Sequence, residues 1–176
     1  MVELKDLPPS ARVKTEWRDG IGIVEIQGEE PCSGFSAEWR IPQDDIQFRW
    51  VADAGKIGIG YPQFLPPDWF SKTTSQLCCR VPVFSLVGAD SGNRLTAAVS
   101  ESVLPVEFHS GISEYSFQAE CRIVFPAFSH PFCVQIRLDL RKIPFSSALR
   151  DVAAWWEKMA EYSPMPVPES ALEPLY

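Results

Sequence analysis

The sequence predicts a mainly β protein, a supersandwich-like fold of two antiparallel sheets with one amphipathic helix near its C-terminus. Apolar and polar residues alternate with a period of two through most of the chain, and turn-forming residues separate the alternating segments. Helical periodicity begins only after residue 145. Roughly ten short strands at this spacing favour two packed sheets over a parallel sheet with crossover helices.

Short alternating segments come first, at residues 13–17, 21–26, 37–41, 46–51 and 57–59. The Asp-Gly of "WRDGIG" and the Ala-Gly of "VADAGKIG" are turn signals between them. We therefore expect each of these segments to form a strand.

The segment "GYPQFLPPDWFSKTTSQ" contains three prolines that remove donors from a strand ladder, so we expect a long loop here and no central strand. Two interpretations of its aromatic residues remain open: an apolar plug on the rim of the sandwich, or a contact with a ligand or another domain. These residues are Tyr61, Phe64, Trp69 and Phe70.

The clearest strands lie in the second half of the chain. "VPVFSLVGADSGNRLTAAVS" predicts strand, turn, strand, with the turn at residues 90–93. In "YSFQAECRIVF" the odd-numbered residues from 115 to 125 are apolar, and we expect them in the core. In "CVQIRLDLRK" the even-numbered residues from 134 to 140 should face inward, and the polar residues from 135 to 141 should face solvent.

A helix is expected over residues 147–162, with Ser146 or Ser147 as its N-cap and Asp151 close to its first turn. Trp156 belongs to the apolar stripe and is expected in the core, whereas Trp155 and Tyr162 widen the stripe on one side. Three prolines between residues 164 and 168 then favour an extended, semi-rigid segment. The stripe consists of Leu149, Val152, Ala153, Trp156, Met159 and Ala160.

Composition excludes several classes of function. A net charge of −7 without a basic cluster argues against nucleic acid and anionic membrane as partners, and no apolar run is long enough to span a bilayer. The 5 cysteines include no C-x-x-C pair, so we expect no zinc site and no disulfide framework. Cys121 and Cys133 are expected as buried free thiols. With no visible secretion signal, these thiols favour the cytoplasm.

No catalytic signature is present. The sequence lacks a G-x-S-x-G motif, a Gly-rich phosphate loop and H-E-x-x-H, and its 2 histidines cannot build a metal site. The acidic pairs at residues 29–30 and 44–45 lie in polar, turn-like stretches, so we expect solvated loops. We therefore expect neither catalytic residues nor a cofactor in this chain, and predict that it is not an enzyme alone.

Three stretches resemble the N-terminal part of melibiase-type α-galactosidases, glycoside hydrolase family 36: "SGNRLTAAVSESVLPVEFHSGISEYSFQAECRIVF", "IPFSSALRDVAAWWEKM" and "PVPESALEPLY". The resemblance covers residues 78–176 well and the earlier part loosely. It implies a β-sandwich at residues 1–145, a helix at 146–162 packed on it, and a Pro-rich linker at 163–176 leading to a (β/α)8 barrel of the same polypeptide. In that family a Tyr enters the first barrel strand, which corresponds here to Tyr176.

The resemblance implies a non-catalytic domain that docks the barrel, shapes its pocket and takes part in a homo-oligomer, while the parent hydrolyses terminal α-galactosides. The family's two catalytic aspartates belong to the barrel, so neither has a counterpart here. Trp69, Phe64 and Tyr61 are the candidates for contact with a galactoside, and Trp155, Tyr162 and Tyr176 for the domain interface. A free-standing carbohydrate-binding module is the alternative, and a complete small hydrolase is a third possibility.

Overall fold

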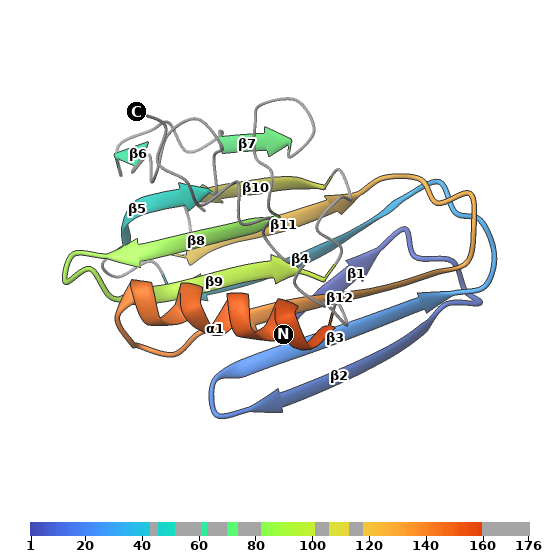
Figure 1. The fold of residues 1–176 in the computed structure, drawn as a ribbon. Coiled ribbons are helices and arrows are strands. Elements are labelled where there is room, and N and C mark those ends of the chain that lie inside the picture. Colours follow the sequence, from blue (N-terminus) through green and yellow to red (C-terminus); the bar gives the residue numbers. More distant parts are fainter. Residues whose placement is uncertain are drawn as a thin grey trace, which may run out of the picture.

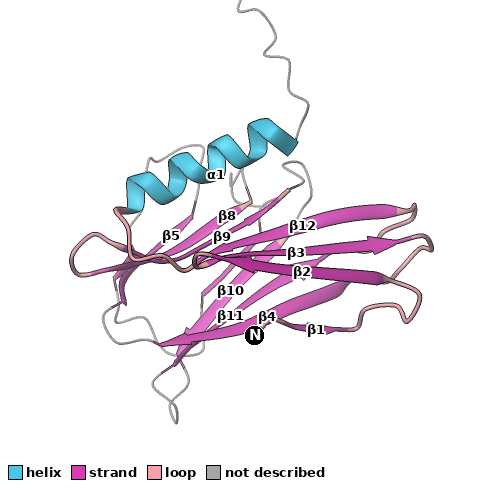
Figure 2. Cartoon of the chain, turned by 90° about the horizontal axis from the view of Figure 1, so that it is seen from below, coloured by secondary structure: helices cyan, strands magenta, loops and turns pink. Residues whose placement is uncertain are grey.

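The computed structural model describes residues 1–42, 46–51, 61–62, 70–73, 82–100, 106–112 and 118–159. These residues form three layers, a five-stranded sheet, a seven-stranded sheet packed on it, and one helix on the outer face of the larger sheet (Figures 1 and 2). The predicted two-sheet β-sandwich with a single helix after its strands is therefore confirmed.

Every strand pair is antiparallel, as expected for a sheet with one face on a core. The smaller sheet has the order β1 (Glu3–Lys5), β4 (Phe35–Pro42), β11 (Gln118–Phe125), β10 (Glu107–Ile112) and β7 (Phe70–Thr73). The larger sheet has the order β2 (Arg12–Arg18), β3 (Ile21–Gly28), β12 (Phe132–Asp139), β9 (Asn93–Val99), β8 (Val83–Gly88), β5 (Ile46–Val51) and β6 (Tyr61–Pro62).

The proline-containing segment is not entirely loop, which corrects the prediction. Two short strands, β6 and β7, fall inside it, and each lies at the edge of its sheet. An edge is where a sheet tolerates proline, because one side of the strand needs no ladder donor. The strand predicted at 57–59 lies outside the described residues, as do residues 63–69.

The core lies between the sheets and is built by the predicted alternation. Ala119, Cys121, Ile123 and Phe125 of β11 are buried, and their neighbours on the other face are half-buried or exposed. Phe125 stacks on Phe35 of β4 with ring centroids 4.5 Å apart. The inward rows of the second half of the chain were thus predicted correctly for the described residues.

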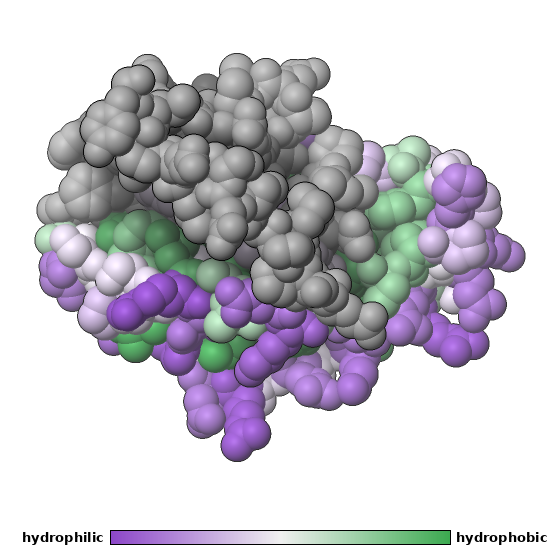
Figure 3. Space-filling view, viewed as in Figure 1, coloured by the Kyte–Doolittle hydropathy of each residue, from purple (hydrophilic) through white to green (hydrophobic). Residues whose placement is uncertain are grey.

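The Asp-Gly signal marks a tight hairpin between β2 and β3. Asp19 has φ of 49° and Gly20 has φ of 80°, which are the two positive φ values of a type I′ turn. Such a turn matches the right-handed twist of the strands it joins. It places β2 along the rim of the larger sheet, and Figure 3 shows that this lower rim is mainly hydrophilic.

Helix α1 (Phe145–Met159) begins two residues before the predicted start, and neither predicted serine caps it. The carbonyl of Pro144 accepts from the N–H of Ala148 at 3.2 Å, so Pro144 is the N-cap residue. The N–H of Phe145 is satisfied instead by the carbonyl of Ser91 in the β8–β9 turn, at 3.2 Å. A tertiary contact has therefore replaced the local cap. Asp151 lies beyond the first turn, which contains no acidic residue.

The buried side of α1 also differs from the predicted stripe. Ala148 and Val152 are buried, whereas Ala153 and Met159 are exposed. A helix lying on a sheet buries a narrow row of residues spaced by four, and here this row starts one residue before the predicted one. The outward side of α1 therefore carries more apolar surface than the sequence pattern indicated.

Candidate domain-docking site

The outer face of the larger sheet carries a second, small apolar cluster beneath α1. Val83 of β8, Ala98 of β9 and Val152 of α1 are buried together. The half-buried side chains around them are Leu149, Trp155, Trp156 and Trp50. The cluster attaches the helix to the sandwich by removing apolar surface from water on both elements.

Trp156 fastens the helix to β9 by a hydrogen bond as well as by packing. Its Nε1 donates to the carbonyl of Val99 at 2.8 Å, and its ring lies 6.4 Å from that of Trp155. Trp156 is half-buried, so the prediction that it is a core residue is wrong. The ring lies at the margin of the helix contact, where its polar N–H reaches the end of a strand.

We expect Trp156→Ala to lower the free energy of unfolding by about 2–3 kcal/mol, less than truncation of a fully buried ring costs. Trp156→Phe keeps most of the packing and removes the donor, so it should cost about 1 kcal/mol. Urea denaturation of both variants measures the difference, with Ala153→Ser, exposed on the same helix, as the control. Equal losses for the two variants would contradict the packing contribution.

A buried cluster of charges lies on the same face and was not predicted. Arg137 and Asp139, expected in solvent, have side chains 4% and 0% exposed. An Nη of Arg137 donates to Asp139 Oδ2 at 3.0 Å, and Nε of Arg141 donates to Asp139 Oδ1 at 2.9 Å. Arg141 also bonds Asp151 of α1 at 2.5 Å. The cluster therefore joins β12 to the helix.

Neutral polar groups extend this cluster across the sheet. Asn93 donates its side-chain amide to the carbonyls of Asp139 and Arg141, both at 3.0 Å. Its Oδ1 accepts from Thr96 Oγ1 at 2.7 Å, and Ser85 lies 2.9 Å from Thr96. The sequence pattern placed Asn93 in a turn. A run of small polar residues on adjacent buried strands was the available signal for its role here.

The contacts within this cluster shift the pKa of Asp139 and of Arg141. Burial of Asp139 alone would raise its pKa, but the hydrogen bonds from Arg141 and the charges of both arginines lower the pKa below its ordinary value. The pKa of Arg141 is raised, first by its hydrogen bond to Asp139 and, against desolvation, also by the bond to Asp151. One nitrogen of Arg137, Nη1, has no hydrogen-bond partner among the described residues.

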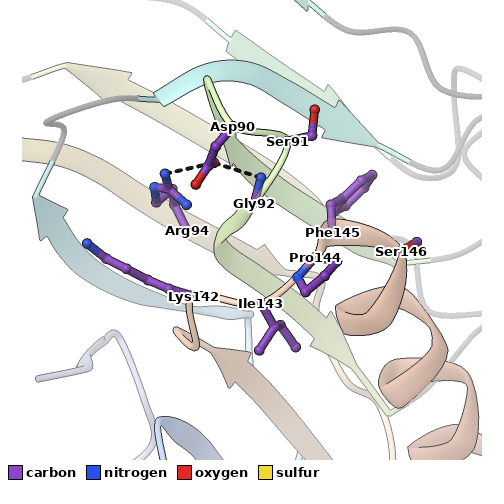
Figure 4. Close-up of a pocket in the computed structure, with 9 residues that line it drawn as sticks. All are labelled: Asp90, Ser91, Gly92, Arg94, Lys142, Ile143, Pro144, Phe145 and Ser146. Atoms are coloured by element: carbon purple, nitrogen blue, oxygen red, sulfur yellow. Dashed lines mark hydrogen bonds and ion pairs between the residues drawn. The ribbon is translucent and has the colours of Figure 1, made fainter.

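A pocket of about 530 Å³ lies at the N-terminal end of α1, between the β8–β9 turn and residues 142–146 (Figure 4). Asp90 Oδ1 accepts from the N–H of Gly92 at 2.8 Å and from Arg94 at 2.9 Å. The bond from Gly92 is the main cause of the lowered pKa of Asp90. Asp90 is therefore ionised at neutral pH, which suits accepting hydrogen bonds and not donating a proton.

The structure places few of the predicted site residues. Trp155 is half-buried beside the helix cluster. Tyr61 lies in β6, and nothing is described of its side chain. The remaining candidates, Phe64, Trp69, Tyr162 and Tyr176, lie outside the described residues.

The cysteines and the acidic pairs give a mixed result. Cys121 is buried as predicted, whereas Cys133 is exposed, because it occupies the outward row of β12. Cys133 is a free thiol. Glu29 and Glu30 are exposed, as predicted for a solvated loop. Residues 44–45 lie outside the described part of the chain.

Among the described residues, no group of three or more His, Cys, Asp and Glu side chains could hold a metal ion. No described helix is both long and apolar enough to cross a membrane. Comparison with family models, with curated proteins and with solved structures finds no match to this chain.

Proposed function

We propose that this chain is the non-catalytic N-terminal domain of an α-galactosidase-like glycoside hydrolase, and that it docks the parent's catalytic barrel. One observation carries the proposal: the segment "IPFSSALRDVAAWWEKM", one of the three stretches that carry the resemblance, forms α1 and supplies most of the bonds that attach it to the sandwich. Trp156, Asp151 and the backbone of Phe145 each bond to the sandwich. The segment is thus an integral part of the sandwich domain.

A helix held this firmly supports a docking role. Contacts at both its ends define the direction in which α1 points, so a following domain would meet a pre-organised surface. Met159 is 39% exposed and Trp155 is half-buried, and both offer apolar area for that domain to cover. In this proposal the sandwich, helix and linker occupy residues 1–145, 146–162 and 163–176, and the parent acts on galactosides in the cytoplasm.

The proposal is tested by reading the source gene beyond codon 176 and expressing the whole product. We expect the reading frame to continue into a domain of alternating strands and helices, and the product to hydrolyse an aryl α-galactoside. A stop codon at this point would overturn the proposal. If the chain then bound galactosides in a titration, it would be the free-standing carbohydrate-binding module.

The purified chain itself is expected to release no aglycone from an aryl α-galactoside. The acid that lines the described pocket is Asp90, and its carboxylate already accepts hydrogen bonds from Gly92 and Arg94. A sensitive absorbance assay checks this, with Asp90→Asn as the control for contaminating activity. Turnover that disappears in the variant would make the chain a complete small hydrolase and contradict the proposal. Turnover that the variant retains is contamination.

A further inference from the structure

Strand β2 is an edge strand with both of its faces open to solvent. All seven of its residues are exposed, including Val13 at 45% and Trp17 at 46%. It pairs with β3 on one side, and no described strand pairs with its other side. Such an edge presents unpaired N–H and C=O groups to which another strand can bond.

The two faces of β2 differ in chemistry. Val13, Thr15 and Trp17 are opposite Ile26, Val24 and Gly22 of β3, so they lie on the face of the sheet that covers the core. The five-stranded sheet does not extend far enough to bury them. The ring of Trp17 covers Gly22, where an added Cβ would lie 2.6 Å from it, and this contact positions the ring.

The opposite face of β2 is charged, and its charges are self-complementary. It carries Arg12, Lys14, Glu16 and Arg18, and Lys14 Nζ lies 2.6 Å from Glu16 Oε1 on the same strand. Charged side chains usually keep an edge strand from pairing. Here the opposite signs at positions 14 and 16 flank Thr15 symmetrically, which favours pairing with an identical strand.

We propose that β2 pairs with β2 of a second copy of this chain, antiparallel about a twofold axis at Thr15, so that the two seven-stranded sheets become continuous. In this register Lys14 is opposite Glu16 of the second copy, and Val13 is opposite Trp17 of the second copy. Each contact occurs twice. Opposite charges and aromatic–β-branched pairs are the cross-strand pairs that stabilise antiparallel sheets.

The charge pattern also selects this register over its neighbours. A shift that centres the pair on Lys14 or on Glu16 places that residue opposite its own copy, which is a pair of like charges. In the proposed register Arg12 is opposite Arg18, but each already has an acidic neighbour. Arg12 lies 3.4 Å from Glu29, and Arg18 lies 3.5 Å from Asp19.

One strand edge of seven residues is a small interface. Interfaces below about 1,200 Å² are usually transient, so we expect a weak dimer that forms as the protein is concentrated. This pairing does not depend on the proposed enzymatic parent. Its test uses only the self-association of this chain, so the two proposals can fail separately.

Sedimentation equilibrium of the chain and of two charge variants tests the pairing. Lys14→Glu places two carboxylates opposite each other across the dimer, and Glu16→Lys places two ammonium groups opposite each other, twice in each dimer. Each variant should raise the dissociation constant about tenfold. An equal mixture of the two variants should restore dimerisation, because every charge then meets an opposite one. Both sites are exposed, so unchanged melting temperatures confirm folding.

The double variant Lys14→Glu/Glu16→Lys is the matched control, since it reverses both charges and keeps them complementary. It should dimerise like the original chain. A chain that stays monomeric at the highest concentration reached would overturn the proposal. Dimers of equal strength in all variants would also overturn it, because the contact would then lie elsewhere. An equal mixture of the two single variants that dimerises no more strongly than either variant alone would overturn it as well.

Discussion

Asp139→Asn is expected to lower the free energy of unfolding by about 3–5 kcal/mol, because it leaves Arg137 as a buried charge without its carboxylate. The amide has nearly the shape of the acid, so packing changes little and the loss reports the charge. For a chain of this length the melting temperature should fall by roughly 10–15 °C. Calorimetry or urea denaturation measures the loss.

Two further variants test whether the unpaired charge of Arg137 causes this loss of stability. Asp90→Asn also removes an acid bonded to an arginine, but Asp90 is largely exposed, so its melting temperature should stay close to that of the parent chain. Adding Arg137→Leu to Asp139→Asn removes the unpaired charge and should restore part of the stability. A double variant less stable than Asp139→Asn would contradict this explanation.

The lowered pKa of Asp139, caused mainly by its hydrogen bonds from Arg141, makes stability depend on pH in a defined direction. The folded pKa of Asp139 is lowered, so its contribution is present above the pKa of the unfolded carboxyl and is lost as pH falls below it. The parent chain should therefore lose stability below about pH 4, while Asp139→Asn loses less over the same range. Parallel curves for the two proteins would show that other acids cause the loss.

Phe125→Ala is the second variant with a large expected effect, a loss of about 3–5 kcal/mol. Phe125 is 2% exposed and stacks on Phe35, so its truncation opens a cavity between the two sheets. Urea denaturation should show a lower midpoint with an unchanged slope. A loss below about 1 kcal/mol would mean that the ring is not part of the packed core.

Val124→Ala is the control for the strand itself. Val124 is the neighbour of Phe125 on β11 but lies on the other face of the sheet, half-buried. Its truncation removes β-branching without opening the core, so the loss should be well below that of Phe125→Ala. If both variants lost the same stability, the effect would come from the strand and not from the aromatic stack.

Local patterns predicted those parts of the fold that depend on neighbours in sequence. Alternation placed Ile123 and Phe125 inward because successive side chains of a strand point to opposite faces. The Asp-Gly pair predicted the β2–β3 turn because these residues tolerate positive φ. The same rule also placed Arg137 outward, which is correct for its face of the sheet and wrong for its burial.

The candidate site was less predictable, because it is made by contacts between distant segments. Arg137 and Asp139 lie on the outward row of β12 but are buried. Arg141 joins Asp139 to Asp151 of α1. The N-cap serine was predicted from local preference, but the β8–β9 turn supplies the carbonyl of Ser91 instead. Neither contact leaves a periodic signal in the sequence.

By itself the sequence determined the antiparallel sandwich, its inward rows and the presence of one terminal helix, since each follows from backbone geometry over a few residues. The tertiary structure decided which face of the larger sheet α1 packs on and which charges of β12 are buried. It also decided that β2 extends past the smaller sheet, which leaves Val13 and Trp17 exposed. Burial depends on what packs above a residue, and that element can lie anywhere in the chain.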